Sequence, residues 1–426
     1  MKRQFHVVVI GGGTSGLCLA QALHKAGVSV AVYERSRTRT ERLQGYRVHI
    51  NPHGSQALHD CLPPDLWQRF VDSCGVSGTY AFLTEQMDEL IRIENDLTSG
   101  ADAASSHHSA SRITLHQVLS AGLDGILHYD KEFERYERNA DGTVTCYFAD
   151  GTTATGDVVV AADGGGSRVR QQYLPHADRV DTGITAIAGK FLLDDESRKL
   201  LPERLLDGPN SVLPPKGCLM FCAPHDLADG RNDETFEHDK VLFDNTTSYI
   251  MWAYAANSAR FPAGLSELDG DGLRDLVGRM IADWHPGFRT MVAASPGEAV
   301  SLLPIRTSVP VKQWETTNIT LAGDAIHSMT PFGGIGANTA LRDARLLAHN
   351  LIEVANGERD LLDAIGDYER QMIDYGFAAV RSSMRNATQA VSESRAGRVV
   401  FKTVLRVCSA VPALKRKMFS GQGTGK

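Results

Sequence analysis

The N-terminal segment restricts the fold of this chain more than any other part of the sequence. Phe5 to Ile10 predicts a short buried strand, Thr14 to Ala26 a helix, and Val28 to Glu34 a second strand. Glycines spaced as Gly-x-Gly-x-x-Gly in the intervening loop permit a tight turn, close approach of the backbone to a pyrophosphate, and close packing of helix on strand. The segment therefore predicts a Rossmann-like α/β domain that binds a nucleotide cofactor. The residues of this loop that we expect to contact the cofactor are Gly11, Gly13, Ser15 and Gly16.

The second strand ends in an acidic residue, Glu34, which is followed by Arg35. An acid at this position accepts hydrogen bonds from ribose hydroxyls, which favours a cofactor with a free 2′-hydroxyl, such as FAD or NAD. We include both residues among the candidate cofactor contacts. Because the chain has only one loop of this kind, we expect a nicotinamide cofactor to visit the protein rather than to reside in it.

Two further glycine-containing segments each follow an apolar run. Asp163 and Gly164 come directly after Val158 to Ala162, and the segment Leu321 to Asn338 passes from a strand through Gly-Asp into a proline-glycine loop. That loop begins a helix, and exposed amides at a helix N-terminus suit a phosphate or a flavin carbonyl. The candidate contacts in this segment are Asp324, Pro331, Gly334, Gly336, Ala337 and Asn338.

Composition limits the function classes. The chain has 426 residues, a net charge of −7 and a pI near 6.1, so nothing argues for nucleic acid as a partner. Its seven cysteines are odd in number and scattered, which favours reduced thiols in the cytoplasm. We find no segment apolar enough to span a membrane and no convincing signal peptide, and we expect a cytoplasmic protein.

No metal site is expected. His49 and His53 have the spacing of a metal-binding pair, but Pro52 and Gly54 argue against the helix that would align them.

The order of the predicted elements indicates a second domain inserted into the first. Short alternating strands between about residues 180 and 300 predict a mostly antiparallel sheet. We assign residues 1–75, 101–180 and 301–370 to a discontinuous nucleotide-binding domain, 76–100 and 181–300 to a substrate domain, and 371–426 to a C-terminal helical segment. The polar stretch 95–111, which contains His107 and His108, predicts an exposed, solvated loop.

The three glycine motifs, in their order and spacing, resemble those of the class A FAD monooxygenases, the single-component flavoprotein aromatic hydroxylases. This family includes phenol and salicylate hydroxylases and tetracycline-modifying monooxygenases. The resemblance covers about residues 5 to 370, and its specific motifs lie in the first 50 residues, around Arg112, and at 157–170 and 318–345. It implies a glutathione reductase-like FAD-binding domain that carries an inserted substrate domain.

The resemblance also implies where FAD lies. The adenosine ribose would rest on Glu34, the ribityl chain near Asp324, and Arg112 would contact the cofactor, while the loop from Pro331 to Asn338 would face the isoalloxazine ring. Arg47 and His49 match the strand at the flavin edge and are the only catalytic candidates. For these two, contact with the flavin and a solvated strand face both remain open.

The chemistry implied is oxygen transfer. In such enzymes NADPH or NADH reduces FAD, O₂ then forms a flavin C4a-hydroperoxide, and this hydroxylates or epoxidises an aromatic or polycyclic small molecule. The alternatives are a reductase or halogenase of the same fold without oxygen transfer, or a ligand-binding flavoprotein without turnover. Met251-Trp252-Ala253-Tyr254 does not match the Trp-x-Trp-x-Ile-Pro segment of flavin halogenases, which lowers that option.

Candidate pocket residues lie on one predicted strand and on the proline loop. Strand alternation puts Tyr249 and Met251 on one face and Trp252 and Tyr254 on the other, so only one pair can face a substrate. We include Tyr249, Met251 and Phe332 as pocket candidates, although packing in the core is favoured for the aromatic residues.

Two further features have more than one interpretation. We expect His327 to be a structural hydrogen-bonding residue rather than a catalytic base. The basic and apolar residues 398–419 are interpreted as packing across the cofactor domain rather than lying on a membrane surface.

Overall fold

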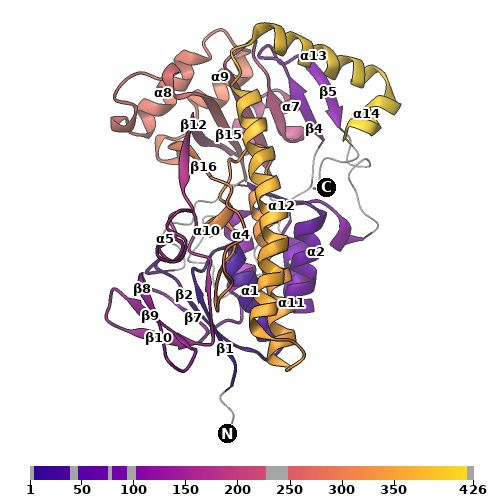
Figure 1. Ribbon diagram of the computed structural model, residues 1–426. Coiled ribbons are helices and arrows are strands. Elements are labelled where there is room, and N and C mark those ends of the chain that lie inside the picture. The colour runs from indigo at the N-terminus through magenta and orange to yellow at the C-terminus, as the bar shows by residue number, and fades with distance from the viewer. Residues whose placement is uncertain (1–3, 39–46, 75–78, 94–101, 227–247, 420–426) are drawn as a thin grey trace.

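The computed structural model describes residues 4–38, 47–74, 79–93, 102–226 and 248–419, with a parallel sheet in the lower part of Figure 1 and a large, mostly antiparallel sheet in the upper part. The parallel sheet has the strand order β17-β11-β1-β2-β7. Val7, Val8 and Val9 are fully buried, and such continuous apolar runs are typical of strands covered on both faces. The predicted Rossmann-like α/β fold is therefore confirmed. The strands are β1 (His6–Ile10), β2 (Ser29–Tyr33), β7 (Leu127–His128), β11 (Val158–Ala161) and β17 (Ile319–Leu321).

Helices pack on one another beside this sheet. Helix α1 begins after Gly13 and ends before Gly27, whose φ of +75° is the left-handed conformation that commonly follows a helix. Inside α1, a Cβ on Gly16 would lie 2.1 Å from the carbonyl oxygen of Gly11, so only glycine allows this packing. The helices in mutual contact are α1 (Thr14–Lys25), α2 (Pro52–Cys61), α4 (Arg112–Ser120) and α11 (Gly336–Ala355), with α3 (Pro64–Ser73) packed beside α4.

A small antiparallel sheet joins the parallel sheet at its β2 side. The ring of Phe148 stacks on that of Tyr33 of β2, with 4.7 Å between ring centroids. Its strands are β8 (Phe133–Arg138), β9 (Val144–Phe148) and β10 (Thr153–Gly156), and α5 (Arg168–Tyr173) packs against β8.

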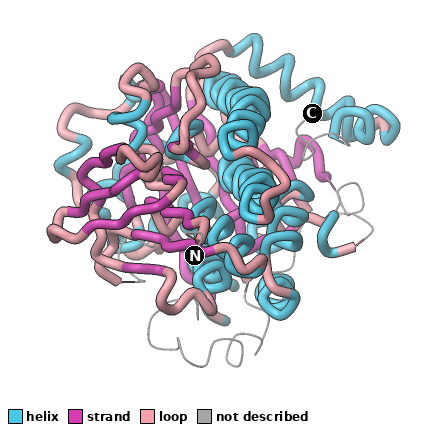
Figure 2. Tube along the Cα trace, turned by 60° about the horizontal axis from the view of Figure 1, so that its bottom comes forward, coloured by secondary structure: helices cyan, strands magenta, loops and turns pink. Residues whose placement is uncertain are grey.

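The large sheet has seven strands in the order β16-β12-β15-β14-β13-β4-β5. All neighbours are antiparallel except β13 and β4, which run parallel. The strands are β4 (Tyr80–Leu83), β5 (Glu89–Ile93), β12 (Arg179–Leu193), β13 (Asn210–Val212), β14 (Cys218–His225), β15 (Ser248–Asn257) and β16 (Ser301–Ser308). The turned view in Figure 2 shows most strands grouped on one side of the helices.

One face of the large sheet is a second hydrophobic core. Trp252 and Tyr254 are buried there with Trp284 and Phe288, and the indole Nε1 of Trp252 donates to Ser295 Oγ at 2.8 Å. Helices α8 (Gly270–Met280) and α9 (Pro286–Ala293), with the short α7 (Glu203–Asp207), supply the side chains that cover this face. The short α6 (Asp195–Lys199) lies beside β12. Tyr249 and Met251 lie on the opposite face of β15, as the alternation predicted.

The sheet does not follow all of the predicted domain limits. Strand β16 pairs with β12 in the large sheet, whereas its residues fall in the segment 301–370 that the sequence assigned to the nucleotide-binding domain. Helix α12 (Leu361–Ala390) likewise crosses the limit set at residue 370. The division into two domains at those positions stays a prediction.

The prediction of an exposed loop at 95–111 is wrong for its last residues. His108–Ser111 form strand β6, which is buried and pairs with β3 (Arg47–Ile50). The polar side chains tolerate burial because they have partners: His108 Nε2 lies 2.8 Å from the carbonyl oxygen of Ala103, and Ser109 Oγ accepts from Arg47. Residues 95–101 lie outside the described residues.

The C-terminal helices connect the two parts. Helix α12 runs from the parallel-sheet part to the large sheet in Figure 1, followed by α13 (Arg395–Ala410) and α14 (Pro412–Phe419). Leu405 and Cys408 of α13 are buried against Leu90 and Ile91 of β5. One face of this helix therefore packs on the protein, but on the large sheet and not across the cofactor domain as predicted. The valines of the other face are exposed. Within the described ranges, no helix is long and apolar enough to cross a membrane.

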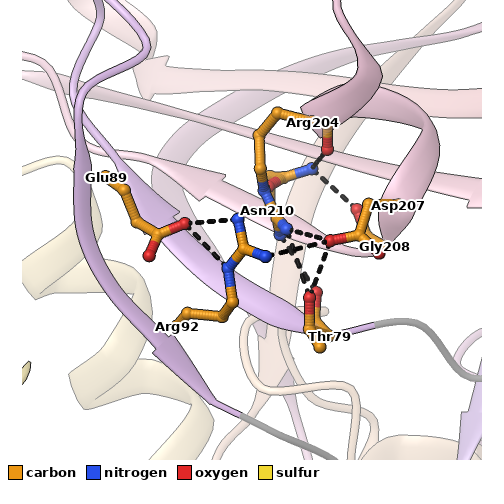
Figure 3. Close-up of polar contacts among 7 residues, drawn as sticks. All are labelled: Thr79, Glu89, Arg92, Arg204, Asp207, Gly208 and Asn210. Atoms are coloured by element: carbon orange, nitrogen blue, oxygen red, sulfur yellow. Dashed lines mark hydrogen bonds and ion pairs between the residues drawn. The ribbon is translucent and has the colours of Figure 1, made fainter.

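Arg204 of α7 holds the far edge of the large sheet (Figure 3). Its guanidinium donates to Asn210 Oδ1 at 2.8 Å, to Asp207 Oδ2 at 2.6 Å and to the carbonyl oxygen of Thr79 at 3.0 Å. Asn210 is fully buried and donates in turn to the carbonyl oxygen of Gly208 at 2.7 Å. One cation therefore joins α7, β13 and the entry to β4.

We expect Arg204→Ala to lower the free energy of unfolding by about 2–4 kcal/mol, because it leaves buried acceptors without donors. Chemical denaturation of the FAD-loaded protein measures this change. The control is Arg135→Ala, whose pair with Glu137 is half exposed and screened by solvent, so its loss should leave the stability nearly unchanged. Equal stability of the two variants would contradict the assigned role of Arg204.

A buried carboxylate joins α12 to the loop before β17. Glu369 is fully buried and accepts hydrogen bonds from Trp314 Nε1 at 3.1 Å, Thr316 Oγ1 at 2.8 Å and Thr320 Oγ1 at 3.0 Å. Burial raises the pKa of Glu369 to about 7, although these hydrogen bonds oppose the rise.

This pKa predicts a pH dependence of stability. Between pH 4.5, the ordinary value for glutamate, and pH 7, the folded chain holds a proton on Glu369 that the unfolded chain has lost, so stability falls as pH rises through this window. Unfolding free energies measured from pH 4.5 to 7.5 should show a shallower fall for Glu369→Gln than for the natural chain. Identical slopes would show that Glu369 does not titrate there.

Candidate active site

The glycine loop after β1 forms a backbone cradle. Gly11 has a φ of +108°, and a Cβ there would lie 2.3 Å from the carbonyl oxygen of Ala162. A Cβ on Gly13 would meet only that same oxygen, at 3.9 Å, so the outer side of this residue is open. Glu34 Oε2 accepts from the amide of Gly12 at 2.7 Å, which places the carboxylate of Glu34 beside the cradle with acceptor capacity left over.

The Asp163-Gly164 turn lies next to this cradle. Asp163 Oδ2 accepts from the amide of Arg168 at 3.0 Å, while Oδ1 is buried and has no hydrogen-bond partner in the described ranges. Burial raises the pKa of Asp163, against the effect of its hydrogen bonds. A buried carboxylate oxygen without a donor is costly, and a ligand hydroxyl is one group that would satisfy it.

The third motif is a strained turn between β17 and α10 (Asp324–His327). Gly323 has a φ of +62°, and a Cβ on it would lie 2.7 Å from Ser15 Oγ and 3.3 Å from Ala340 Cβ. Asp324 is exposed. Burial lowers the pKa of the half-buried Arg179, and the nearby negative charge of Asp324 opposes this lowering. Arg170 ties this turn to the previous one, because it donates to the carbonyl oxygens of Ala325 at 2.7 Å and Gly165 at 3.1 Å.

The fully buried carboxylate of Asp343, in α11, holds this turn in place through hydrogen bonds. Its Oδ2 accepts from the amide of Gly323 and lies next to His327 Nε2, each at 2.6 Å, and its Oδ1 accepts from the hydroxyl of Tyr375 at 2.6 Å. Burial alone lowers the pKa of His327, but the charge and hydrogen bond of Asp343 raise it overall. These contacts support the expectation that His327 is structural.

Asn338 joins the proline loop, residues 331–338, to β3 through hydrogen bonds of its side chain. Its Nδ2 donates to the carbonyl oxygens of His49 at 2.8 Å and Gly334 at 3.0 Å, and its Oδ1 accepts from the amide of Asn51 at 2.8 Å. Both donors of this side chain are occupied by the protein, so we infer that Asn338 positions the loop rather than contacting a cofactor through its side chain.

The strand β3 presents two polar side chains beside that loop. Arg47 Nε donates to Ser109 Oγ at 2.6 Å, and His49 Nε2 lies 2.9 Å from His107 Nδ1 in a stacked pair. Burial lowers the pKa of Arg47 to about 10, so its guanidinium stays charged at neutral pH. Burial, with Arg47 and two neighbouring histidines, lowers the pKa of His49 to about 3, so its ring is neutral.

The inner face of the large sheet meets Arg47. The nearby phenols of Tyr249 and Tyr80 both oppose the lowering of the Arg47 pKa by burial. The hydroxyls of Tyr80 and Ser211 share a hydrogen bond of 2.7 Å. His225 of β14 is tilted against Tyr249 with ring centroids 5.2 Å apart, and neither of its buried nitrogens has a hydrogen-bond partner among the described residues. Burial, with Arg47 and Lys190, lowers the pKa of His225 to about 4. We call Arg47, His49, Tyr80, His225 and Tyr249 the polar cluster.

The other predicted site residues are distributed as follows. Arg35 and Arg112 are exposed, the latter at the start of α4, while Gly336 and Ala337 open α11. A Cβ on Gly334 would lie 3.9 Å from His49 Cβ, which brings the proline loop to β3. Phe332 instead packs against a cluster that includes Ile305, Ala387 and Val391. Met251 is half buried on the Tyr249 face of β15.

Several site residues carried no recognisable signal in the sequence. His225, Tyr80 and Ser211 come from three strands and meet only in the folded sheet. Asp343 was visible in principle, since it lies among apolar residues on the buried stripe of a predicted helix.

Residues 4–184 and 279–382 match the FAD binding domain family. The chain is 30% identical over 389 residues to the dual O-methyltransferase/FAD-dependent monooxygenase CTB3 of Cercospora beticola, which covers 86% of this chain and 44% of that protein. It is 27% identical over 393 residues to the FAD-dependent monooxygenase thnD of Trichoderma harzianum, covering 89% and 92%. The chain therefore spans less than half the length of the first relative and nearly all of the second.

Solved structures agree with the fold. A protein of Photorhabdus luminescens described as an FAD-containing monooxygenase is 37% identical, with a TM-score of 0.80 over 91% of this chain and 98% of the other. Klebsiella pneumoniae HpxO, solved with FAD and uric acid, is 21% identical with a TM-score of 0.78 over 99% and 97%. At 21% identity, the similarity to HpxO shows only that the two proteins share a fold.

The residues of the site fit FAD. The open side of Gly13 and the neighbouring amides suit a pyrophosphate, and the carboxylate of Glu34 suits ribose hydroxyls. The unpartnered Asp163 Oδ1 and the exposed Asp324 suit further hydroxyls of the cofactor.

We expect Asp324→Ala to weaken FAD binding about tenfold or more while the protein stays folded, because an exposed carboxylate that accepts cofactor hydroxyls is lost. Equilibrium titration of the cofactor-free protein with FAD, followed by flavin fluorescence, measures the change. The matched control, Asp283→Ala, removes an exposed carboxylate in the loop between α8 and α9. If Asp324→Ala binds FAD as tightly as the natural chain does, this assignment is wrong.

Proposed function

This chain belongs to the FAD binding domain family, among the class A FAD-dependent monooxygenases, and from that membership we propose that it uses NAD(P)H and O₂ to hydroxylate or epoxidise an aromatic or polycyclic small molecule. Bound FAD supplies the reduction of O₂ by two electrons, from which one oxygen atom passes to the substrate and the other leaves as water. The protein's own residues then have to orient the substrate, exclude water and hold protons.

The observation that carries the proposal is the charged Arg47 at the edge of the polar cluster. The structure gives its guanidinium one hydrogen bond, to the neutral Ser109, and no carboxylate within ion-pair distance among the described residues. A half-buried cation without an anion favours a ligand that carries negative charge next to it. The ionised hydroxyl of a phenol or enol has this property and is also electron-rich, as oxygen transfer requires.

The neutral histidines support the same class of substrate. Because burial lowers the pKa of His49 and of His225 well below 7, each ring keeps a free electron pair on one nitrogen near neutral pH. Such a nitrogen can accept a hydrogen bond from a substrate hydroxyl, and the buried nitrogens of His225, which have no partner among the described residues, gain one when a ligand supplies it. The phenol hydroxyls of Tyr80 and Tyr249 add hydrogen-bond donors around the flat ring of such a substrate.

The relatives point to ring substrates as well. One protein to which the chain is 26% identical is the 6-hydroxynicotinate 3-monooxygenase of Bordetella bronchiseptica, whose name describes oxygenation of a hydroxylated aromatic ring. The fungal dual-function relatives combine oxygenation with O-methylation, a reaction that also acts on hydroxyl groups. We propose a hydroxylated aromatic or polycyclic substrate on these grounds.

The deciding experiment measures NADPH and NADH oxidation together with O₂ uptake by the FAD-loaded protein. The panel comprises simple phenols, hydroxylated naphthalenes and anthraquinones, and hydroxypyridines, and products are identified by mass. Stimulated O₂ uptake with a product heavier by one oxygen supports the proposal and names the substrate class. Flavin reduction without an oxygenated product would indicate a reductase, and binding without any reduction would indicate a ligand-binding flavoprotein.

A variant tests the polar cluster separately. We expect Arg47→Gln to lower kcat/KM for the best substrate about 100-fold, because a charge-assisted contact with an anionic hydroxyl is lost. Arg279→Ala, which removes an exposed arginine of α8, should leave kcat/KM unchanged. If Arg47→Gln retains natural kcat/KM, Arg47 does not recognise the substrate, whatever the reaction proves to be.

A further inference from the structure

A cavity of about 780 Å³ lies outside the cofactor cradle and the polar cluster. It is bordered by the start of β12, the end of β16, α12 and the start of α13, elements that meet near the middle and top of Figure 1. Helix α12 stands between it and the proline loop, since Thr330 Oγ1 donates to the carbonyl oxygen of Ser383 at 2.9 Å. Its volume is in the range that binds small molecules. We call it the α12 groove.

Two arginines give the α12 groove a positive rim. Arg381 and Arg385 are one helical turn apart on α12, and both side chains are exposed. Over the ranges that the structure describes, neither guanidinium has a carboxylate within ion-pair distance. Like charges at this spacing repel each other, and a bound anion would relieve that repulsion. A third arginine of the groove, Arg398, is already bonded to the carbonyl oxygen of Ala390 at 2.7 Å.

The floor of the groove contains two hydroxyls without partners. Thr307 and Ser308 of β16 are 7% and 3% exposed, and neither hydroxyl oxygen has a hydrogen-bond partner within the part of the chain that the structure describes. Unsatisfied buried hydroxyls are uncommon because each forfeits the hydrogen bonds it makes with water. Rotation about the Cα–Cβ bond of Thr307 exchanges its hydroxyl with its methyl group without breaking a hydrogen bond. A ligand in the groove would offer such a hydroxyl the partner that it lacks.

Apolar side chains complete the wall. Val180 and Val309 are 45% and 39% exposed, and Met384 and Phe401 line the groove from α12 and α13. Exposed apolar surface beside a pair of unpaired cations is a combination that suits an amphipathic anion.

We propose that the α12 groove binds an anionic amphipathic small molecule, with its carboxylate, sulfonate or phosphate group on Arg381 and Arg385 and its apolar body against Val180, Met384 and Phe401. Thr307 donates a hydrogen bond to the anionic end or to a polar group beside it. None of these residues belongs to the FAD cradle or the polar cluster, so this site does not depend on the proposed reaction.

The test uses 8-anilinonaphthalene-1-sulfonate as the probe with the full FAD-loaded chain, and follows probe fluorescence. The double variant Arg381→Ala with Arg385→Ala should bind at least tenfold more weakly than the natural chain, and Thr307→Val about threefold more weakly. Arg279→Ala, an exposed arginine on another surface, should bind as the natural chain does. Unchanged affinity in the double variant would overturn the proposal.

Further arms separate charge from shape and identify the head group. The double variant Arg381→Lys with Arg385→Lys keeps both charges and should stay within about threefold of the affinity of the natural chain. Weakening equal to that of Arg381→Ala with Arg385→Ala would overturn the role given to the anion. Octanoate and octyl phosphate then compete with the probe. Displacement by either one, reduced in the alanine variant, supports the site and names its head group, and displacement by neither contradicts it.

Discussion

The carboxylate of Asp343 holds together the parts of the structure on which cofactor binding depends. It is fully buried and receives hydrogen bonds from the Gly323 amide, from His327 and from Tyr375. These donors come from the turn after β17, from α10 and from α12, while Asp343 itself belongs to α11. A buried charge with this many partners is strongly stabilised, and removal of one partner leaves the others unsatisfied. The position of Asp324 therefore depends on a residue that is itself fully buried in another helix.

Local patterns in the sequence were enough to predict the cofactor-binding half of the fold. The strand, glycine loop and helix at Gly11 to Gly16 form one continuous unit, and their packing depends on residues a few positions apart or on one neighbouring strand. The same holds for Asp163-Gly164 and for the turn at Gly323, where positive φ angles require glycine. Periodicity and turn chemistry report such short-range constraints directly.

The half that contains the large sheet could not be predicted in this way. The polar cluster joins β3, which pairs with β6, to β4, β14 and β15 of the large sheet, and these strands are brought together by long-range pairing and not by neighbours in sequence. His107 and His108 were interpreted as solvated because they lie in a polar stretch, yet their hydrogen bonds to His49 and Ala103 allow them to be enclosed. A polar residue in sequence indicates exposure only until tertiary structure provides its partner. The parallel pairing of β13 with β4 had no sequence signal at all.

Helix α12 has a mechanical consequence. Its 30 residues make a continuous rod about 45 Å long. Near its start Glu369 is bonded to Thr320 of β17, and near its end Ala387 and Val391 pack against β12 and β16. A rod anchored at both ends resists rotation of one sheet relative to the other, because any hinge would have to bend or detach the helix. Entry and departure of molecules at the junction of the sheets should therefore proceed through rearrangement of local segments, with the frame around them nearly still.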